Sequence, residues 1–391
     1  MLLSISLMLL MGMFLGWVCK KLRLPSLLGM MFTGVILGPY VLNLIDESIL
    51  NISAELRRIA LIIILTRAGL TLNIHDLKKV GRPAILMCFI PATFEIIGMV
   101  ILAPKLFEVS VLEAAIMGSV VAAVSPAVIV PKMIKLIEEG YGVKKGIPQL
   151  ILAGASVDDV FVIVLFAAFT GLAQGEQVSV VSFLNIPVSI CLGILVGFLI
   201  GFVMAKFFEK VHIRDTAKVI IMLSISFALV TLEDTITGAI TFSALISIMF
   251  IGIALQKYRK EASARLSIKF NKLWVCAEIF LFVLVGATVD LHYVTGAAIS
   301  AILLLFGVLC FRTLGVFLCL LRTELSLKER LFCMLAYMPK ATVQAAIGGV
   351  PLAMGLGCGN IVLTVAVMAI LITAPLGAFF IELTYKKLLM H

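Results

Sequence analysis

"SVVAAVSPAVIVPKM", residues 119–133, decides the fold, because it places a proline inside a run apolar enough to cross a bilayer. Pro126 removes a backbone donor and clashes with the preceding turn, so the sequence predicts a helix that breaks there. A second run, "LAYMPKATVQAAIGGVPLA" at 335–353, carries Pro339 in the corresponding place. One such proline is compatible with a simple kink. Two at corresponding positions favour the discontinuous helices of a transporter, whose unwound backbone is buried or lines a cavity.

The composition is that of a membrane protein. Of 391 residues, 62% are hydrophobic and 14% are charged, whereas a soluble globular chain is about 25% charged. A membrane-spanning helix needs about 20 mostly apolar residues. The sequence predicts thirteen such spans and no soluble domain, and their ranges are 2–18, 25–43, 56–73, 83–104, 112–131, 148–172, 180–205, 216–232, 238–255, 272–290, 294–321, 330–352 and 360–385. The first span has no basic leader, so we expect a retained helix and not a signal peptide.

Basic residues alternate between the loops. When loops are assigned to alternate sides of the membrane, 25 Lys and Arg residues fall on one side and only Arg57, Arg58 and Lys105 on the other. The positive-inside rule therefore predicts an N-terminus outside and a C-terminus in the cytoplasm. The net charge of +9 reflects this topology and not nucleic-acid binding. The 8 cysteines and 4 histidines lack the spacing of metal sites or disulfides. The sequence also has no phosphate-binding loop motif, which argues against an ATP-driven pump.

The two broken spans belong to halves that correspond. Glu95 precedes Ser125 by thirty positions, and Arg312 precedes Lys340 by twenty-eight. By the loop alternation, the first broken span runs from outside to inside and the second runs back, so the halves are predicted to be inverted repeats. The two breaks are then expected to cross near the bilayer midplane. The predicted crossover residues are Pro126, Ala127, Pro339 and Ala341.

Few charged side chains lie within the predicted spans, and lipid would reject them without partners. They are Arg67, Glu95, Asp158, Asp159, Glu278, Arg312 and Lys340. Asp158 and Asp159 lie in "AGASVDDVFV" at 153–162 and cannot point at one spot, because successive helical residues are about 100° apart. We expect one to face the crossing while the other leans on Arg312 or Lys340. A purely structural ion pair is the alternative.

Oxygen ligands are the chemistry that this arrangement offers. Carboxylate and carbonyl oxygens suit small hard cations. A carboxylate that holds either a proton or a Na⁺-sized ion, but not both, makes an exchanger, because each ligand displaces the other. We expect sodium at Asp159 and Asp158, with Ser125 and Thr342 as further oxygen ligands.

The other intramembrane charges are expected to be mainly structural. Glu95 is a candidate gate, or a structural partner of Arg57 or Arg58. Arg67 is a candidate gate or structural pair, and its place near a span end favours snorkelling or capping. Glu278 lies at the edge of its span and suits an ordinary buried ion pair.

Four motifs carry a resemblance to a known family. "ASVDDV" after "AVSPAV", with "TRAGL" upstream and "MPKATVQAAIGG" downstream, resembles the monovalent cation/proton antiporters. The chain looks most like their aspartate-pair branch, which holds bacterial Na⁺/H⁺ antiporters and the animal NHA-type exchangers. The resemblance covers essentially the whole chain. It implies a homodimer in which an ion-binding core, about 83–172 and 294–385, moves like an elevator against a dimerisation scaffold, about 1–73 and 180–290.

The resemblance also implies roles for individual residues. Asp159 resembles the principal ion and proton ligand, and Asp158 its partner. Lys340 matches the core lysine of the family, and Arg312 matches the arginine that can bridge the first aspartate in the NHA-type group. Ser125 and its following proline match the first crossover. Electrogenic relatives use a lysine as the partner of the first aspartate, and arginine does not deprotonate in proteins, so net charge movement is left open.

The sequence therefore predicts an all-α polytopic membrane protein with about thirteen helices, inverted repeats and two crossed discontinuous helices. The predicted function is secondary Na⁺(Li⁺)/H⁺ antiport in a bacterial cytoplasmic membrane, with no enzyme activity and no cofactor. Its expected partners are these ions, membrane lipid and a second copy of the chain. The alternatives are K⁺/H⁺ antiport, a Na⁺-coupled organic-anion symporter of the same fold, an intramembrane aspartyl protease and a non-transporting sensor. The protease is disfavoured, because its two aspartates converge from different helices.

Overall fold

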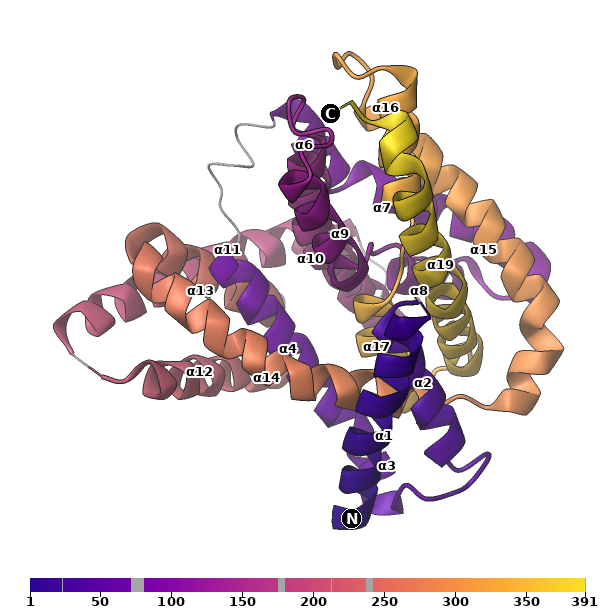
Figure 1. The fold of residues 1–391 in the computed structure, drawn as a ribbon. Coiled ribbons are helices and arrows are strands. Elements are labelled where there is room, and N and C mark those ends of the chain that lie inside the picture. Colours follow the sequence, from indigo (N-terminus) through magenta and orange to yellow (C-terminus); the bar gives the residue numbers. More distant parts are fainter. Residues whose placement is uncertain (23, 72–80, 175–179, 212, 237–241, 391) are drawn as a thin grey trace. The chain divides into compact units, whose positions relative to one another are not determined.

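The computed structural model describes all residues except 23, 72–80, 175–179, 212, 237–241 and 391, and its regular elements there are helices (Figure 1). The chain forms two compact units. The first unit comprises Met1–Arg57, Asp76–Ala173 and Ile279–His391, and the second comprises Arg58–His75 and Gln174–Glu278.

Most helices belong to the first unit. They are α1 (Leu2–Lys21), α2 (Ser26–Leu37), α3 (Glu47–Asn51), α6 (Arg82–Met87), α7 (Ile90–Phe107), α8 (Val111–Val121), α9 (Pro126–Glu138), α10 (Ile147–Ala173), α15 (Leu291–Cys319), α16 (Leu327–Ala336), α17 (Thr342–Ile347), α18 (Val350–Ala353) and α19 (Gly359–Leu388). The second unit holds α11 (Val180–Lys210), α12 (Asp215–Thr235) and α13 (Ala244–Tyr258). The chain passes from one unit to the other within α4 (Ser53–Thr71) and α14 (Lys260–Ala287).

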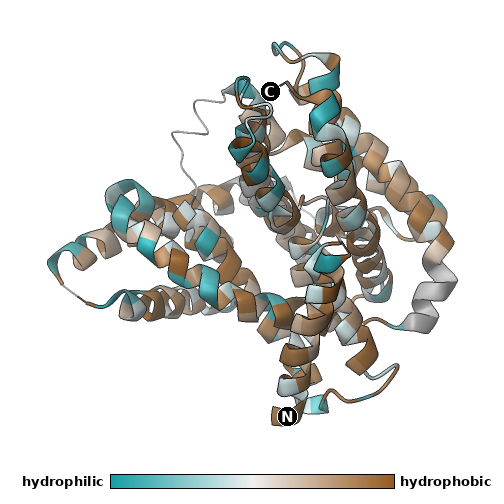
Figure 2. Ribbon diagram, viewed as in Figure 1, coloured by the Kyte–Doolittle hydropathy of each residue, from teal (hydrophilic) through white to brown (hydrophobic). Residues whose placement is uncertain are grey.

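The helices are apolar over most of their length (Figure 2). In the part of the chain that the structure describes, 9 helices are long and apolar enough to cross a membrane. Shorter apolar helices are Ser26–Leu37, Ala244–Tyr258 and Thr342–Ala353. Helical residues overlap every one of the thirteen predicted ranges, although residues 238–241 of the ninth lie outside the described residues. The helical, membrane-spanning architecture predicted from the sequence is confirmed.

Both broken spans begin with a capping box, a reciprocal pair of hydrogen bonds at the start of the helix. Ser110 accepts a hydrogen bond from the backbone N–H of Glu113, whose side chain bonds back to the N–H of Ser110. Ser326 and Glu329 form the same reciprocal pair at the start of α16. This capping box satisfies amide groups that the first turn of a helix leaves without partners. The two spans therefore start alike as well as break alike.

Several predicted spans differ from the observed helices. The range 83–104 is interrupted at Cys88–Phe89, because Pro91 stands in the first turn of a new helix, α7. The range 25–43 is too long, since α2 ends at Leu37 before Gly38 and a proline. The range 272–290 is too short, because α14 begins at Lys260 in a charged stretch that hydropathy does not detect.

Glycine allows two pairs of helices in the first unit to approach backbone to backbone. A side chain at Gly29 would clash with the carbonyl of Leu15, where α2 meets α1. A side chain at Gly34 would clash with the carbonyl of Val283, where α2 meets α14. Small residues at such contacts are the usual means by which membrane helices pack closely.

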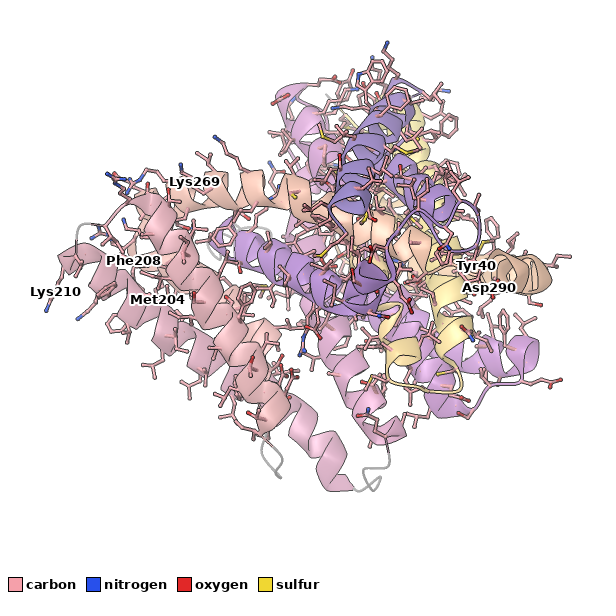
Figure 3. All side chains as sticks on the ribbon, turned by 90° about the horizontal axis from the view of Figure 1, so that it is seen from below. Tyr40, Met204, Phe208, Lys210, Lys269 and Asp290 are labelled. Carbon is pink, nitrogen blue, oxygen red and sulfur yellow. The ribbon has the colours of Figure 1, made fainter. Side chains whose placement is uncertain are left out.

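The second unit carries exposed basic residues and buried apolar residues on the same helices. Lys210 on α11 and Lys269 on α14 are exposed and point away from the ribbon (Figure 3), whereas Met204 and Phe208 on α11 are buried. Apolar side chains therefore make most of the core of this unit, although Lys218 on α12 is also buried, where it pairs with Asp215.

We expect Gly34→Ala to destabilise the protein by about 1–3 kcal/mol, the usual cost of overpacking. The added methyl group would meet the backbone carbonyl of Val283, which cannot move away as a flexible side chain can. The thermal melting midpoint of the purified protein measures the effect. Phe32→Leu on the same helix is the control, because Phe32 is exposed. Equal midpoints for Gly34→Ala and the parent protein would show that the close packing is not required.

Candidate functional site

The two helix breaks of the first unit touch through their backbones. Residues 122–125 separate α8 from α9, and residues 337–341 separate α16 from α17. The backbone N–H of Ser125 donates to the carbonyl oxygen of Pro339 at 2.8 Å. Pro126 opens α9 and is followed by Ala127, while Ala341 is the N-cap of α17. All four predicted crossover residues therefore lie at or beside the two breaks.

Backbone groups freed at the breaks are satisfied by side chains from other helices. The amide nitrogen of Gln344 donates to the carbonyls of Val121 and Ala123 at 3.0 and 2.9 Å. The N–H of Lys340 donates to the hydroxyl of Thr373 at 2.9 Å. Such compensation is what makes an unwound helix tolerable at membrane depth.

A buried arginine ties the breaks to the aspartate pair. Arg312 on α15 donates to the carbonyls of Ala122 and Tyr337, one at each break. Its Nη2 also bonds Oδ2 of Asp158 on α10 at 2.9 Å, and both side chains are fully buried. Of the two partners expected for Asp158, the structure shows Arg312 in the ion pair.

Glu95 on α7 extends this ion pair into a chain. Its Oε2 accepts from Nη1 of Arg312 at 2.6 Å and from Nζ of Lys340 at 2.6 Å. The expectation that Glu95 pairs with Arg57 or Arg58 is wrong. Both cations that pair with Glu95 come from segments far away in the sequence: Arg312 lies on α15, and Lys340 lies in the second break.

Arg57 and Arg58 have other contacts. Nε of Arg57 donates to the carbonyl of Ser53 at 3.2 Å, within its own helix. Arg58 bonds Asp234 at 2.7 Å in the second unit. Neither is an ion-pair partner of Glu95, which lies in the first unit.

Asp159 differs from the other buried carboxylates of the cluster. Its side chain is 9% exposed, and no hydrogen bond or ion pair to it is found among the described residues. The cluster as a whole contains the carboxylates of Glu95, Asp158 and Asp159 but only the cations of Arg312 and Lys340. With all five groups ionised, one negative charge is left over, and Asp159 is the group that carries it.

Several buried oxygens around the breaks also have no hydrogen-bond donor among the residues that the structure describes. They are Oε1 of Glu95, Oγ of Ser125, Oδ1 of Asp158, Oδ1 of Asp159, Oγ1 of Thr342 and Oε1 of Gln344. Oxygen atoms without donors suit a hard cation of low charge. Within the described part of the chain, no group of three or more His, Cys, Asp or Glu side chains could hold a metal ion. A cation at Asp159 would therefore draw on hydroxyl, amide or carbonyl oxygens as well as carboxylates.

Arg67 and Glu278 both lie in the second unit, apart from the residues that form the cluster. They interact electrostatically with each other. This arrangement is compatible with the structural pair expected for each of them. A role for Arg67 as a gate stays a prediction.

Two residues of the cluster are missing from the sequence predictions. The ring of Tyr337 lies 5.0 Å from the guanidinium carbon of Arg312, and its hydroxyl donates to the carbonyl of Met87 at 3.1 Å. Gln344 joins the two breaks through its amide. Both stand in the apolar stretch around Pro339, and a tyrosine and a glutamine inside such a run are the signal that could have identified them.

Comparison with known proteins identifies the family. A family model described as "Sodium/hydrogen exchanger, transmembrane" matches residues 5–387. The chain belongs to the sodium/hydrogen exchanger family. Human sodium/hydrogen exchanger 9B2 is 32% identical over 385 residues, which cover 94% of this chain and 70% of that protein. Human sodium/hydrogen exchanger 9B1 is 31% identical, over 94% of this chain and 73% of that protein.

A solved structure shares the fold of this exchanger. The sodium proton antiporter MjNhaP1 from Methanocaldococcus jannaschii, at pH 8, matches with a TM-score of 0.86 and 21% identity over 98% of this chain and 97% of that one. Family and fold together make the chain a multi-pass membrane transporter and not an enzyme. The prediction of Na⁺/H⁺ antiport is confirmed at the level of the family, and the alternative of an intramembrane protease is excluded.

We expect Glu95→Gln to destabilise the protein by on the order of 3–5 kcal/mol, because breaking a buried ion pair leaves its partner charge uncompensated. Here the uncompensated group is Lys340. The double variant Glu95→Gln/Lys340→Met removes both partners and should recover most of the loss. Thermal melting midpoints measure the changes.

Glu382→Gln is the matched control, since Glu382 pairs with Lys132 and Lys135 at a partly exposed position. Such pairs contribute about 0–1 kcal/mol. A midpoint for Glu95→Gln no lower than that of Glu382→Gln would contradict the importance of the buried chain of charges.

Proposed function

We propose that Asp159, with Asp158 beside it, binds either a proton or a Na⁺ (or Li⁺) ion, and that this competition drives exchange in this member of the family. The proposal places the chain in the aspartate-pair branch. Its support is the single uncompensated negative charge of the buried cluster, which lies at Asp159. A site with one excess negative charge can be neutralised by one monovalent cation or by one proton, but not by both.

The oxygens without donors support the choice of cation. Ser125 is the last residue of the first break and Thr342 follows the second, and both side chains are buried, with hydroxyl oxygens that accept no hydrogen bond from the described residues. Together with the carboxylate of Asp159 they offer hard oxygen ligands, which Na⁺ and Li⁺ prefer to softer donors. We therefore assign Ser125 and Thr342 as supporting ligands of the transported ion.

The ion pairs support a one-for-one exchange that moves no net charge. Arg312 holds Asp158 and does not deprotonate in a protein, while Lys340 is held by Glu95. With these four groups fixed in charge, Asp159 is the member of the cluster that changes its ligand. One Na⁺ then replaces one proton, and the charge carried across the membrane is the same in both directions.

The segments that move during transport can be proposed from the position of the ion site. Asp159, both breaks and Arg312 lie in segments 83–172 and 294–385, which we propose as the ion-binding core that carries the site from one side to the other. The segments 1–73 and 180–290 would form the scaffold and the contact with a second copy of the chain. The charge alternation of the loops supports a cytoplasmic C-terminus, and the membrane that we propose is a bacterial cytoplasmic membrane.

We expect Asp159→Asn to abolish Na⁺-induced proton movement in proteoliposomes, because the asparagine amide cannot exchange a proton for a cation. Proton movement is followed with a pH-sensitive dye after addition of Na⁺, Li⁺ or K⁺ at several pH values. In the parent protein the apparent Na⁺ affinity should weaken as the pH falls, since protons then occupy Asp159. The K⁺ series tests whether K⁺ is the transported ion instead.

Asp215→Asn is the control, because Asp215 pairs with Lys218 and Arg265 in the second unit. This variant should exchange as the parent does. Exchange retained by Asp159→Asn would refute the assignment of the site.

We expect the exchange rate to be independent of membrane potential. Proteoliposomes with equal Na⁺ and proton gradients are compared with and without a potential set by K⁺ and valinomycin. Equal rates are the result of a cycle in which Asp158 keeps Arg312 as its partner. A rate that follows the potential would show that a second group, such as Lys340, also changes its protonation state.

A further inference from the structure

Gln344 holds the unwound backbone of the first break from the opposite side of the crossing. It stands in the first turn of α17, just after the second break, and its side chain is 1% exposed. Its Nε2 donates to the carbonyls of Val121, the last residue of α8, and of Ala123, which lies within the break that follows. Because both neighbours are acceptors, the amide orientation is set by chemistry: the reverse orientation would face oxygen with oxygen.

The opposite atom of the same amide faces away from those carbonyls. Oε1 of Gln344 is buried and has no donor among the described residues. It belongs with the hydroxyls of Ser125 and Thr342 among the oxygens of the two breaks that lack donors. The carbonyls of Val121 and Ala123 each keep a second lone pair, because a carbonyl oxygen has two.

The neutral amide suits this position better than any charged donor would. Lys or Arg could also donate to two carbonyls, but a third cation would cancel the single excess negative charge of the cluster. A glutamine supplies two N–H donors without changing the charge. The charge balance therefore favours an amide at this place.

We propose that Gln344 is a specificity-determining residue. By fixing the carbonyls of Val121 and Ala123 it sets the spacing of the oxygen site, and so determines how strongly Na⁺ is preferred over K⁺. Oxygens discriminate between cations by their number, their dipole strength and the spacing at which they are held. The inference rests on the proposed site at Asp159 and goes beyond it, since it concerns which cation is chosen and not whether one is bound.

Gln344→Met tests the proposal, because methionine has a similar length and no N–H donor. The ratio of the apparent affinities for Na⁺ and K⁺ should change about tenfold, equivalent to about 1.4 kcal/mol, while exchange persists. Both cations compete with the same proton, so the ratio removes the effect of pH on Asp159. Gln149→Met is the matched control: Gln149 on α10 is half-buried and also has a donor-less Oε1, but it bonds neither break. Its ratio should equal that of the parent.

Gln344→Glu supplies a second readout. Its protonated form retains one O–H donor and its ionised form has none, so the cation ratio should approach that of the parent as the pH is lowered. The ratio of the parent should stay constant over the same range. If a variant does not transport, the Na⁺- and K⁺-dependent shifts of its melting midpoint give the same ratio from binding alone.

Two outcomes separate this inference from the proposed function. An unchanged ratio in Gln344→Met and Gln344→Glu, with Asp159→Asn inactive, would overturn the role of Gln344 and leave the site at Asp159 intact. Exchange in Asp159→Asn would overturn the site itself. A changed ratio in Gln149→Met as well would reduce Gln344 to a general structural role and contradict the proposal.

Discussion

The site depends on the hydrogen bonds and ion pairs that the guanidinium of Arg312 makes. Four acceptors meet it: carboxylates on α10 and α7, and one carbonyl from each helix break. Each of these acceptors would be costly to bury in lipid without a donor. The planar group of arginine, with five N–H donors and a permanent charge, can serve all of them at once, which a lysine could not. Arg312 thus explains why two carboxylates and two unwound segments can occupy the same dry region.

The charge balance of the cluster follows from this arrangement. Arg312 and Lys340 neutralise Asp158 and Glu95, and the remaining carboxylate is Asp159. A cluster with equal numbers of carboxylates and cations would have no excess charge with which to attract a cation or a proton. The competition that we propose between a proton and a cation at Asp159 would supply the missing positive charge, in keeping with membership of the sodium/hydrogen exchanger family.

The sequence predicted the parts of the structure that depend on local chemistry. Apolar runs predicted the spans, and prolines predicted the breaks. The orientation that the loop charges predict stays a prediction. The partner of Glu95 was not predicted, because Lys340 lies 245 positions away and no periodicity records such a contact. The hydrogen bonds of Gln344 were missed for the same reason, since its acceptors lie on the other half of the chain. The start of α14 was missed because helices continue into charged segments that hydropathy excludes.

The hydrogen bond from Ser125 to Pro339 joins the two breaks through main-chain atoms alone. A bond between backbones does not depend on which side chains stand at those positions, provided that residue 125 keeps its N–H. The junction of the two half-helices can therefore persist while the side chains around it are replaced one after another. A family built on such a junction is free to change its cargo through substitutions beside the crossing, without having to rebuild the crossing each time.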